Sequence, residues 1–295
     1  MISLIKKIIN SFLSKCNMKI IKLDSINHHD LTNADCNFLS AQYLAKSSHM
    51  IFKVKLEDGR TSRGFDMSNN SLDPAIFAIS KALKKKLNKN DLYNDILVTL
   101  QEQQSLIHFN SAADILDSNI SNNFKNYPWW AAVNPWDNQS PDARSKYFPF
   151  EVKKNRNNNR MQILTNDPIK IMELDLKGSV FSHAKQYSEL IEKININGFR
   201  YSAKYGYVNA EMLVDSGKIR WKLGADGNHR GAVAAAMNLK TIPVLITKII
   251  RLEELEYWPN VQNGVFNKNQ ASKIFNSFFE AKPAGIYNNW IKKIT

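Results

Sequence analysis

The stretch from residue 222 to residue 246, KLGADGNHRGAVAAAMNLKTIPVLI, constrains the fold more than any other part of the chain. An apolar run ending at Leu223 predicts a short strand, and a tight turn follows at residues 225–228. Small residues from Gly231 to Met237 predict a helix, and Ile242–Ile246 predicts a second, buried strand. The order strand, turn, helix, strand predicts an α/β unit.

The turn and the start of this helix form a candidate anion site. Free backbone N–H groups at a helix N-terminus, together with the positive end of the helix dipole, favour phosphate. Gly227 allows close approach of the backbone, and His229 and Arg230 add side-chain donors. The same residues also suit an ordinary solvent-facing turn, so phosphate binding is a hypothesis at this point.

The motif Asp226-Gly227-Asn228-His229-Arg230, followed by alanines, Leu239 and Ile242-Pro243-Val244, resembles the second signature of the ParB/sulfiredoxin superfamily. Three upstream segments fit the same superfamily, namely a first strand, a helix ending in a glycine turn and a strand leading into the motif: Ile169–Leu176, residues 188–199 and residues 217–224. The resemblance covers residues 166–250, a ParB/sulfiredoxin-like nucleotide-binding module.

Within the superfamily, the motif is most similar to the Asp-Gly-x-His-Arg pattern of the free-serine kinase branch. That resemblance implies ATP or another nucleotide as ligand, an unknown small-molecule acceptor, and phosphate contacts from six residues: Gly227, Asn228, His229, Arg230, Gly231 and His183. It also implies that Asp226 orients a magnesium ion or accepts a proton from an attacking hydroxyl. Glu173 and Asp175, at the end of the expected first strand, are candidates for a second catalytic carboxylate.

Two other branches of the superfamily fit less well. Sulfiredoxins need a cysteine just before the His-Arg pair, where this chain has Asn228. The chromosome-partition members carry a helix-turn-helix domain, and the sequence after residue 250 shows no such signature. A DNA-binding or nuclease role is therefore the weakest of three hypotheses, behind a phosphotransferase or hydrolase and a non-catalytic nucleotide sensor or scaffold.

A segment rich in tryptophan and proline at residues 127–150 precedes the module. Trp129, Trp130 and Trp136 could stack on a ring or sugar of a substrate, although packing at a domain junction is the favoured reading. The WAAVNPWDN pattern of this segment resembles uncharacterised proteins of bacterial surface-polysaccharide gene clusters. A link to polysaccharide biosynthesis is expected on that ground.

The net charge of +13 over 295 residues would suit nucleic acid, an anionic membrane or an acidic substrate. The charge is concentrated in two clusters: residues 81–89 and 144–160. Cys16 and Cys36 have no metal or redox spacing, and the sequence shows no cleavable leader, so a reducing cytoplasm is expected. Residues 1–16 predict an amphipathic helix, which either lies on the inner face of a membrane or packs on the protein core.

The fold class expected is α/β, or loosely α+β. An N-terminal α+β region at residues 17–165 precedes the module, and a helical tail at residues 251–295 follows it. Within the N-terminal region, the sequence predicts a strand at Met50–Leu56, a hairpin turn at Asp58-Gly59 and helices that begin at Asp73-Pro74 and Asp91. Ser140-Pro141-Asp142 predicts a short helix, followed by a basic loop at Lys153–Arg160.

Overall fold

A computed structural model describes all residues except 1–27, 35–36, 45–48, 117–121, 159–162 and 203–205. The amphipathic helix predicted at residues 1–16 and the two cysteines, Cys16 and Cys36, therefore lie outside the described residues. No helix in the described part of the chain is both long enough and apolar enough to cross a membrane.

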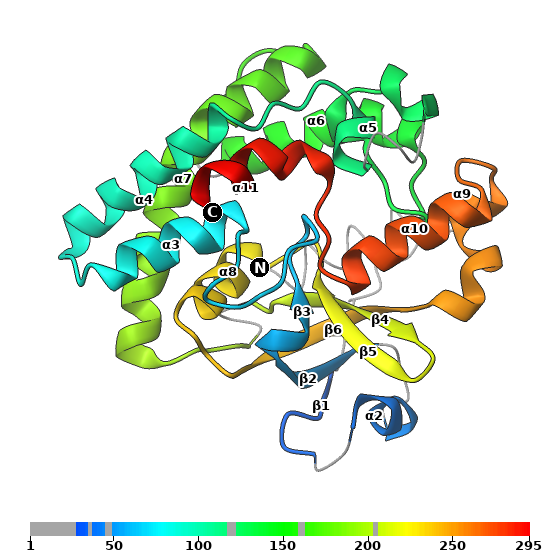
Figure 1. The fold of residues 1–295 in the computed structure, drawn as a ribbon, viewed down its shortest axis with the longest axis horizontal. Helices are drawn as coiled ribbons and strands as arrows, with labels where there is room; N and C mark the ends of the chain where they lie inside the picture. Colours follow the sequence, from blue (N-terminus) through cyan, green and yellow to red (C-terminus); the bar gives the residue numbers. More distant parts are fainter. Residues whose placement is uncertain (1–27, 35–36, 45–48, 117–121, 159–162, 203–205) are drawn as a thin grey trace, which may run out of the picture.

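Six strands form one mixed sheet in the order β1-β2-β6-β4-β5-β3 (Figure 1). Their bounds are β1 His29–Asp30, β2 Met50–Lys55, β3 Gly59–Arg60, β4 Asn209–Asp215, β5 Lys218–Leu223 and β6 Thr241–Arg251. Strand β2 is antiparallel to β6, β6 is parallel to β4, and β4 is antiparallel to β5. Short strands β1 and β3 add parallel pairs at the two edges. The regions 17–165 and 166–250 thus contribute strands to a single sheet.

Ten described α-helices surround this sheet. They are α2 Phe38–Leu44, α3 Pro74–Lys84, α4 Lys89–Gln104, α5 Ala112–Leu116, α6 Pro141–Asn158, α7 Pro168–Asn197, α8 Asn228–Ala236, α9 Pro259–Gln262, α10 Lys268–Phe279 and α11 Asn288–Ile294. Short 3-10 turns lie at Leu56–Asp58, Asn122–Asn126, Trp129–Ala131, Leu252–Tyr257 and Gly285–Tyr287. The predicted helices α3, α4 and α8 and the predicted strands β2, β5 and β6 are confirmed, and α9, α10 and α11 lie within the predicted helical tail.

Two apolar clusters hold the layers together, one on each face of the sheet. The larger cluster packs α3, α4, α7 and α8 against β2, β4, β5 and β6, and the smaller packs α5, α9 and α10 against the opposite face. Strand β4 shows why two clusters form, because side chains alternate between faces along a strand. Met212 belongs to the larger cluster and Leu213 to the smaller.

The C-terminal helix α11 lies beside α3 (Figure 1). The ring of Trp290 packs edge-on against Phe77 at a centroid distance of 5.2 Å, and its indole N–H donates to the carbonyl of Leu72 at 2.9 Å. Trp290 is 1% exposed, so the end of the chain is anchored to the helical layer.

Three sequence predictions about secondary structure are wrong. Ile169–Leu176 belongs to α7 and is not a strand, because a proline at the first helical position and the Asp167 side-chain cap start a 30-residue helix there. Asp58-Gly59 does not close a hairpin, since β3 pairs in parallel with β5. The predicted basic loop is helical as far as Asn158, because α6 runs 18 residues from Pro141.

Helix α6 continues through Pro149, which explains why its length was missed. A proline inside a helix lacks the N–H that would bond the carbonyl four residues earlier. Here that carbonyl belongs to Ser145, and it accepts a hydrogen bond from the indole N–H of Trp130 at 3.2 Å. The side chain of Trp130 thus replaces the partner that Pro149 removes.

Candidate functional site

The turn between β5 and α8 is built around Gly227. Its φ of 81° lies in the left-handed region, and a Cβ added there would lie 2.6 Å from the Cα of Val208. Only glycine fits this position. No side chain caps α8, and its first backbone bond runs from the N–H of Gly231 to the carbonyl of Gly227 at 2.9 Å. The N–H groups of residues 228–230 thus precede the helical ladder, so this end of α8 is suited to an anion.

Gly231, predicted to contact phosphate, has a packing role in the structure. It is buried, and a Cβ added there would lie 2.8 Å from the Cδ2 of Leu223. The missing side chain lets α8 approach the end of β5 closely. This contact fixes the direction in which the helix N-terminus points.

The motif side chains do not converge on one hollow. Asn228 lines a cleft of about 1590 Å³, whereas Asp226, His229 and Arg230 line a separate hollow of about 700 Å³. Arg230 donates from Nη1 to the carbonyl of Gly206 at 2.8 Å. Asp226 is exposed, and its Oδ2 accepts from Nδ2 of Asn209 at 3.4 Å.

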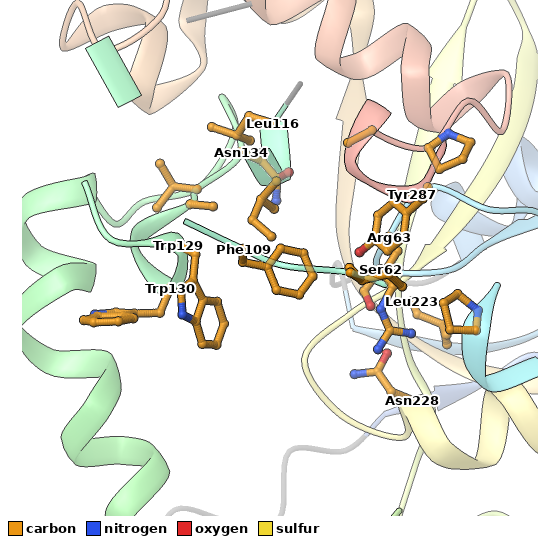
Figure 2. Close-up of a pocket in the computed structure, with 18 of the residues that line it drawn as sticks. Ser62, Arg63, Phe109, Leu116, Trp129, Trp130, Asn134, Leu223, Asn228 and Tyr287 are labelled. Atoms are coloured by element: carbon orange, nitrogen blue, oxygen red, sulfur yellow. The ribbon is translucent and has the colours of Figure 1, made fainter. Parts of the chain in front are cut away.

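The large cleft separates the start of α8 from a layer formed by α5, α6 and the Trp129–Ala131 turn. Figure 2 shows Arg63 and Asn228 on one side of this space and Trp129 and Trp130 on the other. Predicted and unpredicted residues share its wall: Arg63, Phe109, Trp129, Trp130, Arg156, Glu173, Asp175, His183, Asn228 and Tyr287.

Arg63 is a cleft residue that the sequence analysis missed. Its Nη1 lies 3.3 Å from Oδ2 of Asp73, and its side chain keeps 42% of its surface exposed. Asp73 also caps α3, because its Oδ1 accepts from the N–H of Ala75 at 2.9 Å. Although burial works to lower the pKa of Arg63, the Asp73 carboxylate and the phenol of Tyr287 raise it above its usual value. Arg63 is therefore a fixed positive charge.

His183 and His229 lie close together beside this charge. Their ring centroids are 4.8 Å apart, and the ring of Tyr187 lies 5.2 Å from that of His229. Burial, followed by repulsion from His229, Arg63 and Arg156, lowers the pKa of His183 to about 3. Burial and the same two arginines also lower the pKa of His229. Both imidazoles are neutral at pH 7, in an electropositive environment.

Glu173 and Asp175 both line the cleft, but on α7 and not at the end of a strand. On a strand, residues two apart share a face, whereas on a helix they point about 200° apart. Asp175 contacts Nε of Arg156, and Glu173 is exposed. The two carboxylates are therefore not a preformed pair, and Asp226 faces the other hollow.

The three candidate tryptophans separate into two groups. Trp136 is 3% exposed and packs edge-on against Trp258 at 5.4 Å, so it belongs to the core and cannot stack on a substrate. Trp129 and Trp130 are half-buried and line the cleft. Trp136 thus packs in the core, whereas the stacking role expected of Trp129 and Trp130 stays a prediction.

Other predicted features lie outside the cleft or do not gather. Among the described residues, no three His, Cys, Asp or Glu side chains cluster in a way that could hold a metal ion. In the first basic cluster, Lys85 pairs with Asp95 and Lys89 with Glu192, both across neighbouring helices. The second cluster contributes Arg144 and Arg156 to the cleft wall.

Comparison of the chain with protein-family models, with curated proteins and with solved structures finds no match.

Proposed function

We propose that the chain binds the phosphates of a nucleotide at the N-terminus of α8, inside the large cleft. The observation that carries this proposal is the gathering of positive groups at an uncapped helix start. Arg63 and Arg156 line the same cleft as Asn228. Burial is the main cause of the lowered pKa values of both nearby imidazoles, and repulsion from these two arginines adds to it, a repulsion that a bound phosphate would relieve.

Each group has a distinct part in this binding mode. The free N–H of Asn228, the residue of this turn that lines the large cleft, meets a phosphate oxygen at the positive end of the helix dipole. The Arg63 guanidinium supplies a permanent charge in a planar fork that suits phosphate, and Asp73 holds it in place. The Asn228 side chain anchors the turn, since its Nδ2 donates to the carbonyl of Gly224 at 3.3 Å.

The resemblance of the motif supports the same proposal. Strand β5, helix α8 and strand β6 follow one another in the order that the ParB/sulfiredoxin-like signature implies. The upstream strand implied by that resemblance is replaced by the first half of α7. The support from the resemblance therefore comes from the helix expected at residues 188–199, which corresponds to the end of α7 before Gly198, and from the segment β5 to β6.

A phosphotransferase or hydrolase acting on a small molecule is the reaction class we favour. Of the two candidate carboxylates on α7, Glu173 is better suited to accept a proton from an attacking hydroxyl, because it is exposed in the cleft while Asp175 already pairs with Arg156. Magnesium is commonly held by one or two carboxylates together with substrate phosphates, and holding the ion is the alternative role of Glu173 to accepting the proton. When bound, the ion would neutralise charge on the phosphates.

The proposal is tested by calorimetric titration of ATP, with and without magnesium, into the wild type and Arg63→Gln. Glutamine removes the charge but can still donate to Asp73, which limits the damage to the fold. Arg220→Gln is the matched control, because Arg220 pairs with Asp58 at 2.9 Å with similar exposure and does not line the cleft. We expect a loss of affinity of at least tenfold in Arg63→Gln and little change in Arg220→Gln.

A third variant locates the phosphates. Arg230→Ala removes a side chain of the smaller hollow, so loss of ATP binding in this variant alone would assign the site to that hollow. Absence of binding to the wild type would refute the nucleotide proposal.

An assay for nucleotide turnover and a titration of duplex DNA at increasing salt separate the remaining alternatives. Saturable binding without turnover selects the nucleotide-sensing or scaffold role over the enzyme. Binding to duplex DNA that weakens steeply with salt, with no nucleotide binding, selects a DNA-binding role.

A further inference from the structure

A row of aromatic rings lines the cleft wall and leads towards the positively charged side chain of Arg63. Trp130 packs edge-on against Trp129 at 5.7 Å, Trp129 lies 5.8 Å from Phe109, and Phe109 lies 6.4 Å from Tyr287. In Figure 2, Phe109 lies between the indole of Trp129 and the side chains of Tyr287 and Arg63. We call Phe109, Trp129 and Trp130 the aromatic wall.

The aromatic wall is held rigidly from behind. The indole N–H of Trp130 donates to the carbonyl of Ser145, and the carbonyl of Trp130 accepts a hydrogen bond from Nε of Arg144 at 2.9 Å. The Arg144 guanidinium also lies 4.4 Å from the ring centroid of Phe148. Because Trp130 has its polar group engaged, it can offer a ligand mainly its ring surface.

Trp129 and Trp130 differ from the other tryptophans of the chain. Trp136, Trp221, Trp258 and Trp290 are between 1% and 5% exposed, whereas these two are half-buried beside open space. The cleft of about 1590 Å³ also exceeds the roughly 300–1,000 Å³ of ordinary ligand pockets. Phosphate groups at α8 would leave much of it unfilled.

We propose that the aromatic wall stacks against the planar ring of the same molecule whose phosphates bind at α8. This inference rests on the proposed function and names the ligand class as a phosphate-bearing planar ring, with the ring recognised by its face. Every nucleobase presents a π-face, so stacking of this kind is tolerant of base identity. The site therefore selects for phosphates and accepts the four common bases with affinities within about tenfold of one another.

The test compares probes that share one part of the molecule. Inorganic triphosphate, adenosine, ATP, GTP, CTP and UTP are each titrated into the wild type, Trp129→Ala and Trp129→Phe, by calorimetry and by tryptophan fluorescence. We expect ATP to bind at least about tenfold more tightly than triphosphate in the wild type, as stacking on one aromatic side chain allows. Trp129→Ala should lower ATP affinity to the triphosphate level and leave triphosphate affinity unchanged.

Trp129→Phe is the control for misfolding, because it keeps an aromatic ring in the aromatic wall. It should retain most of the ATP affinity and lose part of the ATP-induced fluorescence change. Unchanged triphosphate affinity in both variants shows that the phosphate site at α8 is intact.

The two proposals fail in distinguishable ways. Equal affinities for ATP and triphosphate, with no effect of Trp129→Ala, would overturn the aromatic subsite and leave phosphate binding standing. A preference for one base well beyond tenfold would also overturn recognition by stacking alone. Absence of binding by triphosphate and by every nucleotide would overturn the proposed function and this inference together.

Discussion

The indole N–H of Trp130 donates to the carbonyl oxygen of Ser145, the helical acceptor that Pro149 leaves without its partner. A bond between a cleft residue and a helix backbone thus compensates for a proline inside α6. The two features should be energetically coupled, since each is costly alone and they offset one another.

A double-mutant cycle measures that coupling. Trp130→Phe alone leaves the Ser145 carbonyl unpaired, whereas Trp130→Phe together with Pro149→Ala restores a backbone N–H that can bond it. We expect Trp130→Phe to lower the free energy of unfolding by about 0.5–1.5 kcal/mol less when Pro149→Ala is present than in the wild type, as measured by urea unfolding. Strictly additive effects would contradict the compensation.

Stability should fall on acidification because His183 is held neutral. Its pKa is about 3 in the folded protein against an ordinary 6.5, so the unfolded chain binds the proton first. The contribution is fully present above pH 6.5 and is lost as the pH falls towards 3. We expect the free energy of unfolding to drop by about 1.4 kcal/mol per pH unit below 6.5 from this group. Urea unfolding from pH 7.5 to 5 should show a smaller drop in His183→Gln, and an identical slope would refute the assignment.

Two glycines with nearly equal φ allow the cost of left-handed backbone strain to be measured apart from the cost of a steric clash. Gly217 has φ 78° with nothing within 4 Å of an added Cβ, whereas Gly227 has φ 81° and the Cα of Val208 in the way. Gly217→Ala should cost about 1–2 kcal/mol through left-handed strain alone. Gly227→Ala should cost at least about 1 kcal/mol more because the backbone must shift. Equal losses in thermal unfolding would mean that the turn relaxes freely.

Comparing two helices that begin at an Asp-Pro pair gives the contribution of the Arg63–Asp73 ion pair to the free energy of unfolding. Asp73 and Asp167 each cap a helix by accepting two backbone N–H groups, but Asp73 is 1% exposed and pairs with Arg63, while Asp167 is exposed. Asp167→Ala should cost about 0.5–2 kcal/mol, the usual value of a cap. Asp73→Ala should cost about 1–3 kcal/mol more, since it also removes a charged hydrogen bond.

Asp73→Asn completes the comparison, because the amide keeps the capping oxygen and loses only the pair with Arg63. In urea unfolding it should cost about 1–3 kcal/mol, the excess expected of Asp73→Ala over Asp167→Ala. A free energy of unfolding equal to that of the wild type would show that the Arg63 pair contributes nothing to stability.

The elements around the motif were predictable because their signals are local. Apolar runs define β5 and β6, and small residues define α8. The errors came from signals that local sequence does not carry. The first half of α7 has apolar residues that fit either a strand or a buried helix, and the Asp167-Pro168 start decides for helix. Helix α6 continues past Pro149 because Trp130, from another segment, donates to the carbonyl that the proline leaves without a partner.

The cleft was only partly predictable for the same reason. Asn228 and His183 were placed near it by the motif resemblance, and Trp129 and Trp130 by composition. The positions of Arg63 and Phe109 at the cleft are set by tertiary packing. Tyr287, which precedes α11, contacts both side chains. Their sequence surroundings carry no motif that could have indicated this position.

The pairing of β2 with β6 has a consequence for how the chain is made. Phe52 lies opposite Val244 in the sheet, 244 − 52 = 192 positions later in the chain. At about 5–20 residues per second, a ribosome needs roughly 10–40 s to add those residues. During that interval β2 has emerged without its central neighbour, and its apolar residues are open to chaperones or to β-strands of other nascent chains. Yield in cells should therefore depend on translation speed between these two strands more than on the stability of the finished fold.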